Sequence, residues 1–209
     1  DANSDVWSGD ESDELEDAQK MANLLRSLPN QIKQARRQVD SADSRLDQQR
    51  KRVHDEVKRE IDRVRQSHRG LLAHQNKSPE IEKLNKALES LQEVNREQKD
   101  RNEWNQDEYE KSFQSVKAAA DGAKKHVGEI RELGDQRETL ALAGLLNNQQ
   151  RHTEDQRKQW EQLKRKQAGD HKKSDAALAA AADKVAQQWA NTKSHLTPGN
   201  RKAYDQAIG

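Results

Sequence analysis

Apolar residues recur along this chain in steps that alternate between three and four residues. At the start of the sequence the series runs Leu15, Ala18, Ala22, Leu25, Leu28, Ile32, Ala35, Val39, Ala42 and Leu46. Steps of this kind place the apolar side chains on one narrow face of an α-helix, as in a coiled-coil seam. Because such a face must be covered by another helix, the period predicts long helices packed side by side.

The composition agrees with helices that bury only a narrow seam. Of the 209 residues, 31% are hydrophobic, 36% are charged and only 3% are aromatic. A disordered chain can have the same composition, so the regular seam has to decide between the two. We therefore expect an all-α protein.

Two breaks divide the seam into three predicted helices. Asn76 to Pro79 supply turn residues, a cap and a proline suited to a first helical turn. Gly134 and Asp135, with Glu138 three residues on, are typical of a C-terminal glycine followed by a capping box. The resulting fold is an elongated antiparallel three-helix bundle, a coiled-coil-like rod. The rod is predicted over 15–196, with helices at 15–75, 79–133 and 136–196.

The two ends are predicted to differ from the rod. Residues 1–14 form an acidic flexible tail, because the segment up to Asp17 carries acidic residues and no basic ones. Residues 197–209 form a short C-terminal helix or linker after Pro198. Pro29 predicts a kink, or a restart with Ser27 as cap. The chain begins without methionine, so we expect a processed protein or a piece of a larger one.

Folding at the two breaks also predicts which residues meet. The expected layers are Leu46 with Tyr109 and Trp160; Leu28 with Val127 and Leu142; and Leu71, Leu72 and Ile81 with Trp189. The polar stretch 95–108 interrupts the second helical seam. We expect it to make the middle of the bundle wet or loosely packed.

The sequence shows no arrangement that indicates catalysis, so we expect no enzyme and no cofactor. There is no cysteine, no phosphate loop and no dinucleotide glycine pattern. The seven histidines lack the helical spacing of a metal site, and we expect them at the surface. The 38 basic and 37 acidic side chains nearly cancel, which gives no argument for nucleic acid binding. No stretch reaches the roughly 20 apolar residues that span a membrane.

Basic side chains are predicted to meet halfway along the rod. They are Arg50, Lys51, Arg52, Lys164, Arg165 and Lys166, with Lys99 and Arg101 beside them. Such a band could dock an acidic protein partner. Acidic residues are interleaved among them, however, and a simple solvated face is the alternative.

Two tryptophans are further candidates for partner contact. Trp104 lies among polar residues, where it is either an interface anchor or packs across the polar layer. Trp7 is the one large aromatic group of the acidic tail, and it either inserts into a groove on a partner or packs on its own bundle. Trp160 lies on the seam, so Trp160→Ala is expected to cost far more stability than Trp104→Ala.

The Ala-rich, charge-rich helices resemble the rod regions of bacterial toxins, bacteriocins and secretion-system proteins. The three-helix layout is similar to spectrin-like repeats and to membrane-bending crescent dimers. These likenesses imply a non-enzymatic structural or interaction protein, a spacer or docking rod of a bacterial secreted or surface-associated system. The alternative is a membrane-associated crescent dimer on anionic membranes. The partner's identity and the compartment stay open.

Overall fold

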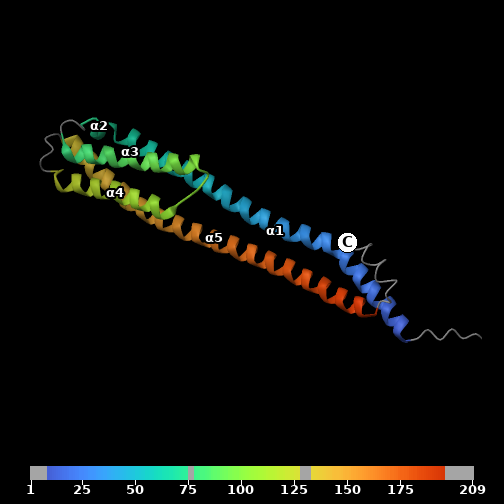
Figure 1. Ribbon diagram of the computed structural model, residues 1–209. Helices are drawn as coiled ribbons and strands as arrows, with labels where there is room; N and C mark the ends of the chain where they lie inside the picture. The colour runs from blue at the N-terminus through green and yellow to red at the C-terminus, as the bar shows by residue number, and fades with distance from the viewer. Residues whose placement is uncertain (1–8, 75–77, 128–132, 196–209) are drawn as a thin grey trace, which may run out of the picture. The chain divides into compact units, whose positions relative to one another are not determined.

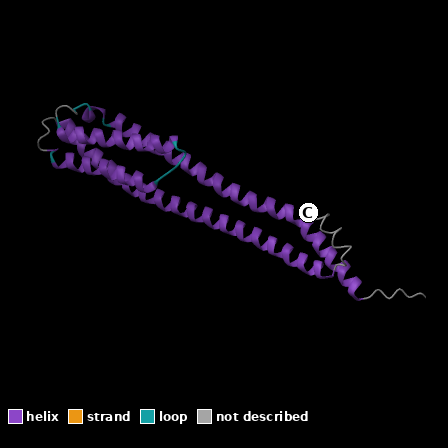
Figure 2. Ribbon diagram, viewed as in Figure 1, coloured by secondary structure: helices purple, strands orange, loops and turns teal. Residues whose placement is uncertain are grey.

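The computed structural model describes residues 9–74, 78–127 and 133–195, and all regular structure within these ranges is helical (Figures 1 and 2). The predicted all-α class is confirmed. The helices are α1 (Gly9–Ser67), α2 (Arg69–Leu72), α3 (Pro79–Asp100), α4 (Gln106–Lys125) and α5 (Leu133–His195). Trp7 and the predicted C-terminal helix lie outside the described residues.

The chain divides into two compact units. We call residues 44–165 the central unit, and residues 1–43 with 166–209 the terminal unit. The long helices α1 and α5 each contribute one part to both units. The helices α2, α3 and α4 belong to the central unit alone.

The central unit is built from four long helical segments around one hydrophobic core. The segments are the parts of α1 and α5 in this unit and the hairpin of α3 and α4 (Figure 1). The seam residues of all four segments meet in the core, where Leu84 and Val116 are fully buried. Of the three residues predicted to share a layer, Tyr109 and Trp160 belong to this core, and Leu46 is partly buried and packs against it.

The predicted second helix over 79–133 is wrong, because it is two helices joined by a tight turn. α3 ends at Asp100, where Asn102 adopts a left-handed backbone conformation with φ of 53°. The amide of Asn102 donates to the carbonyl of Lys99, and the amide of Glu103 donates to that of Gln98. These two bonds form a Schellman motif, which ends a helix by pairing its last carbonyls.

The additional turn also overturns the three-helix arrangement. In the central unit His152 of α5 faces Glu56 of α1, and Asp135 of α5 faces His74 beyond α2. Early residues of α1's part therefore lie beside late residues of α5's part, so these two helices are antiparallel. A three-helix bundle would make them parallel. The reversal between α3 and α4 supplies the change of direction.

Two of the predicted layers fail for the same reason. Leu28 belongs to the terminal unit and Leu142 to the central unit, so they share no layer. Trp189 likewise belongs to the terminal unit, whereas Leu71 and Ile81 lie in the core of the central unit.

In the terminal unit the described parts of α1 and α5 also run antiparallel. Asp43 of α1 accepts hydrogen bonds from Gln167 and His171 of α5, at 2.9 and 2.7 Å. At the other end of the pair, Gln188 of α5 donates to the carbonyl oxygen of Asp17 at 3.1 Å. The polar contacts thus tie α1 to α5 at both ends of this unit.

At Pro29 the predicted restart with Ser27 as cap is wrong, and the predicted kink stays a prediction. The helix continues through Pro29, and the hydroxyl of Ser27 donates to the carbonyl of Leu24 at 2.9 Å instead of capping a new helix. The helix also begins at Gly9, so residues 9–14 of the predicted tail are helical. A proline inside a helix removes one hydrogen-bond donor from the ladder and is a usual cause of a kink.

The two predicted breaks have different outcomes. Ser78 is the N-cap of α3 and Pro79 lies in its first turn, as predicted. The capping box at the second break is wrong, because Gly134 already lies within α5. The Glu138 carboxylate instead accepts a hydrogen bond from the amide of Leu71 at 2.7 Å. The Glu138 carboxylate thus pairs with a main-chain amide of α2 and does not cap α5.

Candidate functional site: a buried polar network at the turn between α3 and α4

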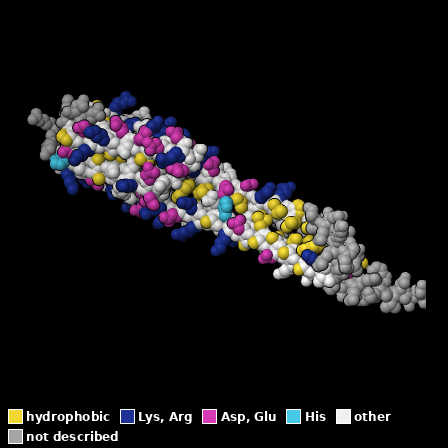
Figure 3. All heavy atoms as spheres, viewed as in Figure 1, with side chains coloured by type: hydrophobic (Ala, Val, Ile, Leu, Met, Phe, Trp, Pro, Cys, Tyr) yellow, Lys and Arg dark blue, Asp and Glu magenta, His cyan; other side chains and the backbone are white. Residues whose placement is uncertain are grey.

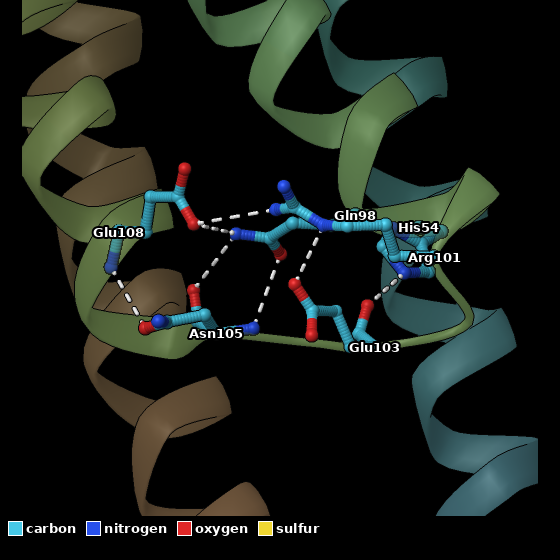
Figure 4. Close-up of polar contacts among 6 residues, drawn as sticks. All are labelled: His54, Gln98, Arg101, Glu103, Asn105 and Glu108. Atoms are coloured by element: carbon cyan, nitrogen blue, oxygen red, sulfur yellow. Dashed lines mark hydrogen bonds and ion pairs between the residues drawn. The ribbon is translucent and has the colours of Figure 1, made fainter.

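The turn between α3 and α4 closes on a buried histidine of α1. His54 is 1% exposed. Its Nδ1 lies 2.8 Å from Oδ1 of Asn95 on α3. Its Nε2 lies 2.8 Å from the main-chain oxygen of Glu103 in the turn, a contact that Figure 4 shows. The amide nitrogen of Asn95 also donates to the main-chain oxygen of His54 at 3.1 Å. One side chain therefore connects α1, α3 and the turn.

Gln98 fastens the turn from the last part of α3. Its Oε1 accepts from the amide of Asn105 at 3.1 Å, and its Nε2 lies 3.3 Å from the carbonyl of the same residue. The same Nε2 donates to the carboxylate of Glu108 at 3.0 Å (Figure 4). Because Gln98 is fully buried, water cannot replace these bonds.

Charged residues surround the rim of this network. Arg101 pairs with Glu103 at 2.8 Å and lies 4.0 Å from Glu108 (Figure 4). Both Arg101 and Glu103 are exposed, so this ion pair contributes little stability. The rim is polar and solvated, while its centre is dry.

An aromatic row covers the centre of the network. Trp104 contacts His54 edge to face, with ring centroids 5.2 Å apart, and Tyr109 at 5.1 Å. Its indole nitrogen donates to Gln106 at 2.8 Å, and Tyr109 stacks on Phe113 at 6.2 Å. Trp104 is 7% exposed, so it is a core residue and not an exposed interface anchor. The interpretation in which it packs across the polar layer is the one the structure supports.

The sequence predicted a wet layer at the polar stretch 95–108. The core-facing residues of this stretch are instead buried and hydrogen-bonded. Asn95, Gln98 and Gln106 are buried, and each has a hydrogen-bond partner within the central unit. Buried polar groups that are fully paired define one arrangement, since every alternative leaves a donor or acceptor unpaired.

The predicted basic band is only partly a surface feature. Arg50 is 8% exposed and is bonded to Asp47 at 2.6 Å, while the exposed Lys51 pairs with the same carboxylate at 3.1 Å. The pKa of Asp47 is lowered by its bonds to these two cations. Four further members are exposed: Arg52, Lys164, Arg165 and Lys166, of which Lys166 belongs to the terminal unit. The solvated-face interpretation fits the members in the central unit.

The expectation that the histidines lie at the surface is wrong for His54 and His68. Burial lowers the pKa of His68, which is 6% exposed and has no hydrogen-bond partner at Nδ1. In the part of the chain that the structure describes, no cluster of histidines and carboxylates could hold a metal ion. A search of the same residues found no helix long and apolar enough to cross a membrane.

The turn could have been recognised from two local signals. Asparagine is the residue other than glycine that most readily adopts the left-handed conformation seen at Asn102. Three residues later, Asn105 and Glu108 have the spacing of a helix N-cap followed by an acidic N3 residue. Both signals lie inside the polar stretch and were interpreted as an interruption of one helix.

Comparison of the chain with protein-family models, curated proteins and solved structures found no match. The fold and the site define an all-α protein with a buried polar network inside a helical core.

The N-cap of α4 gives a first testable prediction. Oδ1 of Asn105 accepts from the amide of Glu108 at 3.1 Å. Asn105→Ala should cost about 1 kcal/mol of unfolding free energy, measured by urea denaturation, because that amide loses its acceptor. Asn105→Asp should retain most of the stability, since aspartate is an equally good cap. A loss in Asn105→Asp as large as in Asn105→Ala would show that the cap is not what holds this position.

Tyr109 gives a prediction for alkaline pH. Burial is the main cause that raises the pKa of the Tyr109 phenol to about 12, against a hydrogen bond with Thr153 that lowers it. Its stabilising contribution is therefore fully present below about pH 10 and is lost as the pH rises through about 12. Ultraviolet absorbance should show a tyrosine ionisation step at about pH 12. Tyr109→Phe should remove this late step, and an unchanged late step in that variant would contradict the prediction.

Proposed function

We propose that this chain is a non-enzymatic helical interaction protein whose terminal unit docks an amphipathic helix of a partner protein. The observation that supports it is an apolar groove of about 540 Å³ between α1 and α5. The groove is lined by Met21, Leu28, Ile32, Leu178, Ala182, Val185, Ala186 and Trp189. Hydrophobic side chains gather on the face of this unit seen in Figure 3.

The contrast between the two units gives the proposal its physical basis. In the central unit the hairpin of α3 and α4 covers the seam of α1 and α5. Among the described residues of the terminal unit, α1 and α5 are the two helices present, and Leu28, Ile32 and Leu178 remain half-buried. Two packed helices cannot by themselves enclose their apolar stripes, and burying these stripes under a third helix gains about 25 cal/mol per Å² of apolar surface.

The experiment that tests the proposal places a photo-crosslinking residue in the groove of the full chain. With the label at Leu178, exposure to light in extracts of the source organism should give a discrete product with one partner. The label at Ala180, which is exposed on the same helix, should give none. Ile32→Asp should abolish the Leu178 product, because a carboxylate in the groove opposes burial.

The alternatives give different results in the same experiment. Equal products at Leu178 and Ala180 would indicate nonspecific contact and would overturn the groove as the docking surface. A product that contains only this chain would show that the groove is filled by the chain itself or by a second copy. Sedimentation with anionic vesicles that depends on salt would favour the membrane alternative.

A further inference from the structure

One face of α1 in the terminal unit is nearly symmetric about Leu25. Ala18 lies seven residues before Leu25 and Ile32 lies seven residues after it, about two helical turns in each direction. Glu14 lies 11 residues before Leu25 and Arg36 lies 11 residues after it, or about three turns. These five residues therefore share one face, which we call the symmetric face. It has an acid at one end, a base at the other and apolar side chains between them.

The apolar middle of the symmetric face borders the docking groove. Ile32 lines the groove on α1, together with Met21 and Leu28. Leu25 follows Met21 by about one turn, and both Leu25 and Ala18 are half-buried. A helix that enters the groove therefore also meets the symmetric face.

The charged ends of the symmetric face are placed to recognise a second copy of the same helix. Arg36 is exposed and Glu14 is half-buried, and within the described residues neither takes part in an ion pair. A two-fold dimer brings the same surface of both subunits together. In an antiparallel pair centred at Leu25, Glu14 of each copy lies level with Arg36 of the other. The dimer thus gains this contact twice.

The same register brings no like charges together on α1 between 14 and 36. The other charged residues of this segment are Glu16, Asp17, Lys20, Arg26 and Lys33. Asp17 lies level with Lys33 of the other copy. The remaining three lie level with uncharged residues, which are Gln34, Asn30 and Leu24. Because like charges that face each other across an interface oppose association, this register is electrostatically favourable.

We propose that the groove of the terminal unit takes α1 of a second copy of this chain, with the two copies of α1 antiparallel and centred at Leu25. The second α1 covers apolar side chains of α1 and α5, and the first α1 covers the groove of the second copy in return. The pairing rests on the proposed function, because it takes the groove as a docking surface for an amphipathic helix. A different partner protein has to displace the second copy.

Sedimentation equilibrium of the purified full chain over a range of concentrations tests the pairing. The wild type should approach twice the mass of one chain. At low salt Arg36→Glu should weaken the dimer on the order of tenfold, because two attractive contacts become repulsive. Glu14→Arg should weaken it likewise. The chain with both changes should dimerise like the wild type, since the two charges exchange places.

Arg26→Glu is the matched control, because it makes the same change of charge at an exposed position about 100° round the helix from Leu25. It should leave the dimer as strong as in the wild type. A chain that stays monomeric at every concentration would overturn the pairing. So would a dimer that Arg36→Glu and Arg26→Glu weaken equally, or one that the double change fails to restore.

The crosslinking experiment in extracts separates a failure of this pairing from a failure of the proposed function. A purified chain that is monomeric, but whose Leu178 label still captures a different protein, removes the second copy and leaves the docking groove. A purified chain that dimerises as expected, but captures no other protein in extracts, removes the separate partner and leaves the pairing.

Discussion

Trp104→Ala is expected to destabilise the central unit by about 3–5 kcal/mol, the usual cost of truncating a buried aromatic side chain to alanine. The indole fills the space between His54 and Tyr109, and its nitrogen donates to Gln106. Truncation leaves a cavity beside a polar network and removes the donor from Gln106. Trp160 is 6% exposed and Trp104 is 7% exposed, so the two variants should lose comparable amounts.

Urea denaturation of the full chain, followed by circular dichroism, measures this loss. Leu140→Ala is the matched control, since Leu140 is a large apolar side chain of the same unit that is 48% exposed. Its effect should stay within about 0.5 kcal/mol. A loss in Trp104→Ala as small as in this control would mean that the tryptophan is not part of the core.

Gln98→Ala is expected to cost about 2–4 kcal/mol, although it removes no apolar group from the core. Its amide pairs with the main chain of Asn105 and with the Glu108 carboxylate. Truncation leaves these groups without their buried partner, and each such loss costs about 1–3 kcal/mol. The amide of Asn105 should also exchange its hydrogen faster, because its acceptor is gone.

Gln114→Ala is the control for this variant. Gln114 of α4 makes a side-chain hydrogen bond to Gln150 at 2.6 Å, but it is exposed. Water replaces an exposed partner, so this variant should be nearly neutral in the same denaturation experiment. If Gln98→Ala unfolds at the same urea concentration as the wild type, the network does not stabilise the turn.

The alternation of apolar residues by itself determined the fold class and most of the core. Residues four or fewer positions apart decide whether a segment is helical and which face is apolar, so Val53, Leu84 and Val116 were recognisable as seam residues and are buried. The break before Pro79 was equally local. Proline and its preceding cap residue begin a helix whatever surrounds them.

The break at 101–105 was harder to recognise because its signals are weak. Asn102, Asn105 and Glu108 are also common on the polar face of a continuous helix. The same segment can continue as helix or turn back, and the choice depends on what its side chains meet. One missed turn was enough to change three helices into a helical hairpin and two long helices.

Only the tertiary structure decided which residues of the polar stretch 95–108 are buried. The sequence predicted a wet or loosely packed layer here and left the role of Trp104 open. The reason is that His54, the partner of Asn95 and Trp104, lies 41 residues before Asn95. Polar side chains can be buried only where complementary donors and acceptors meet. Periodicity in the sequence shows whether a residue prefers water or the core. Hydrogen-bond pairing between buried side chains depends on two surfaces, and these surfaces meet only after the hairpin of α3 and α4 has packed on α1.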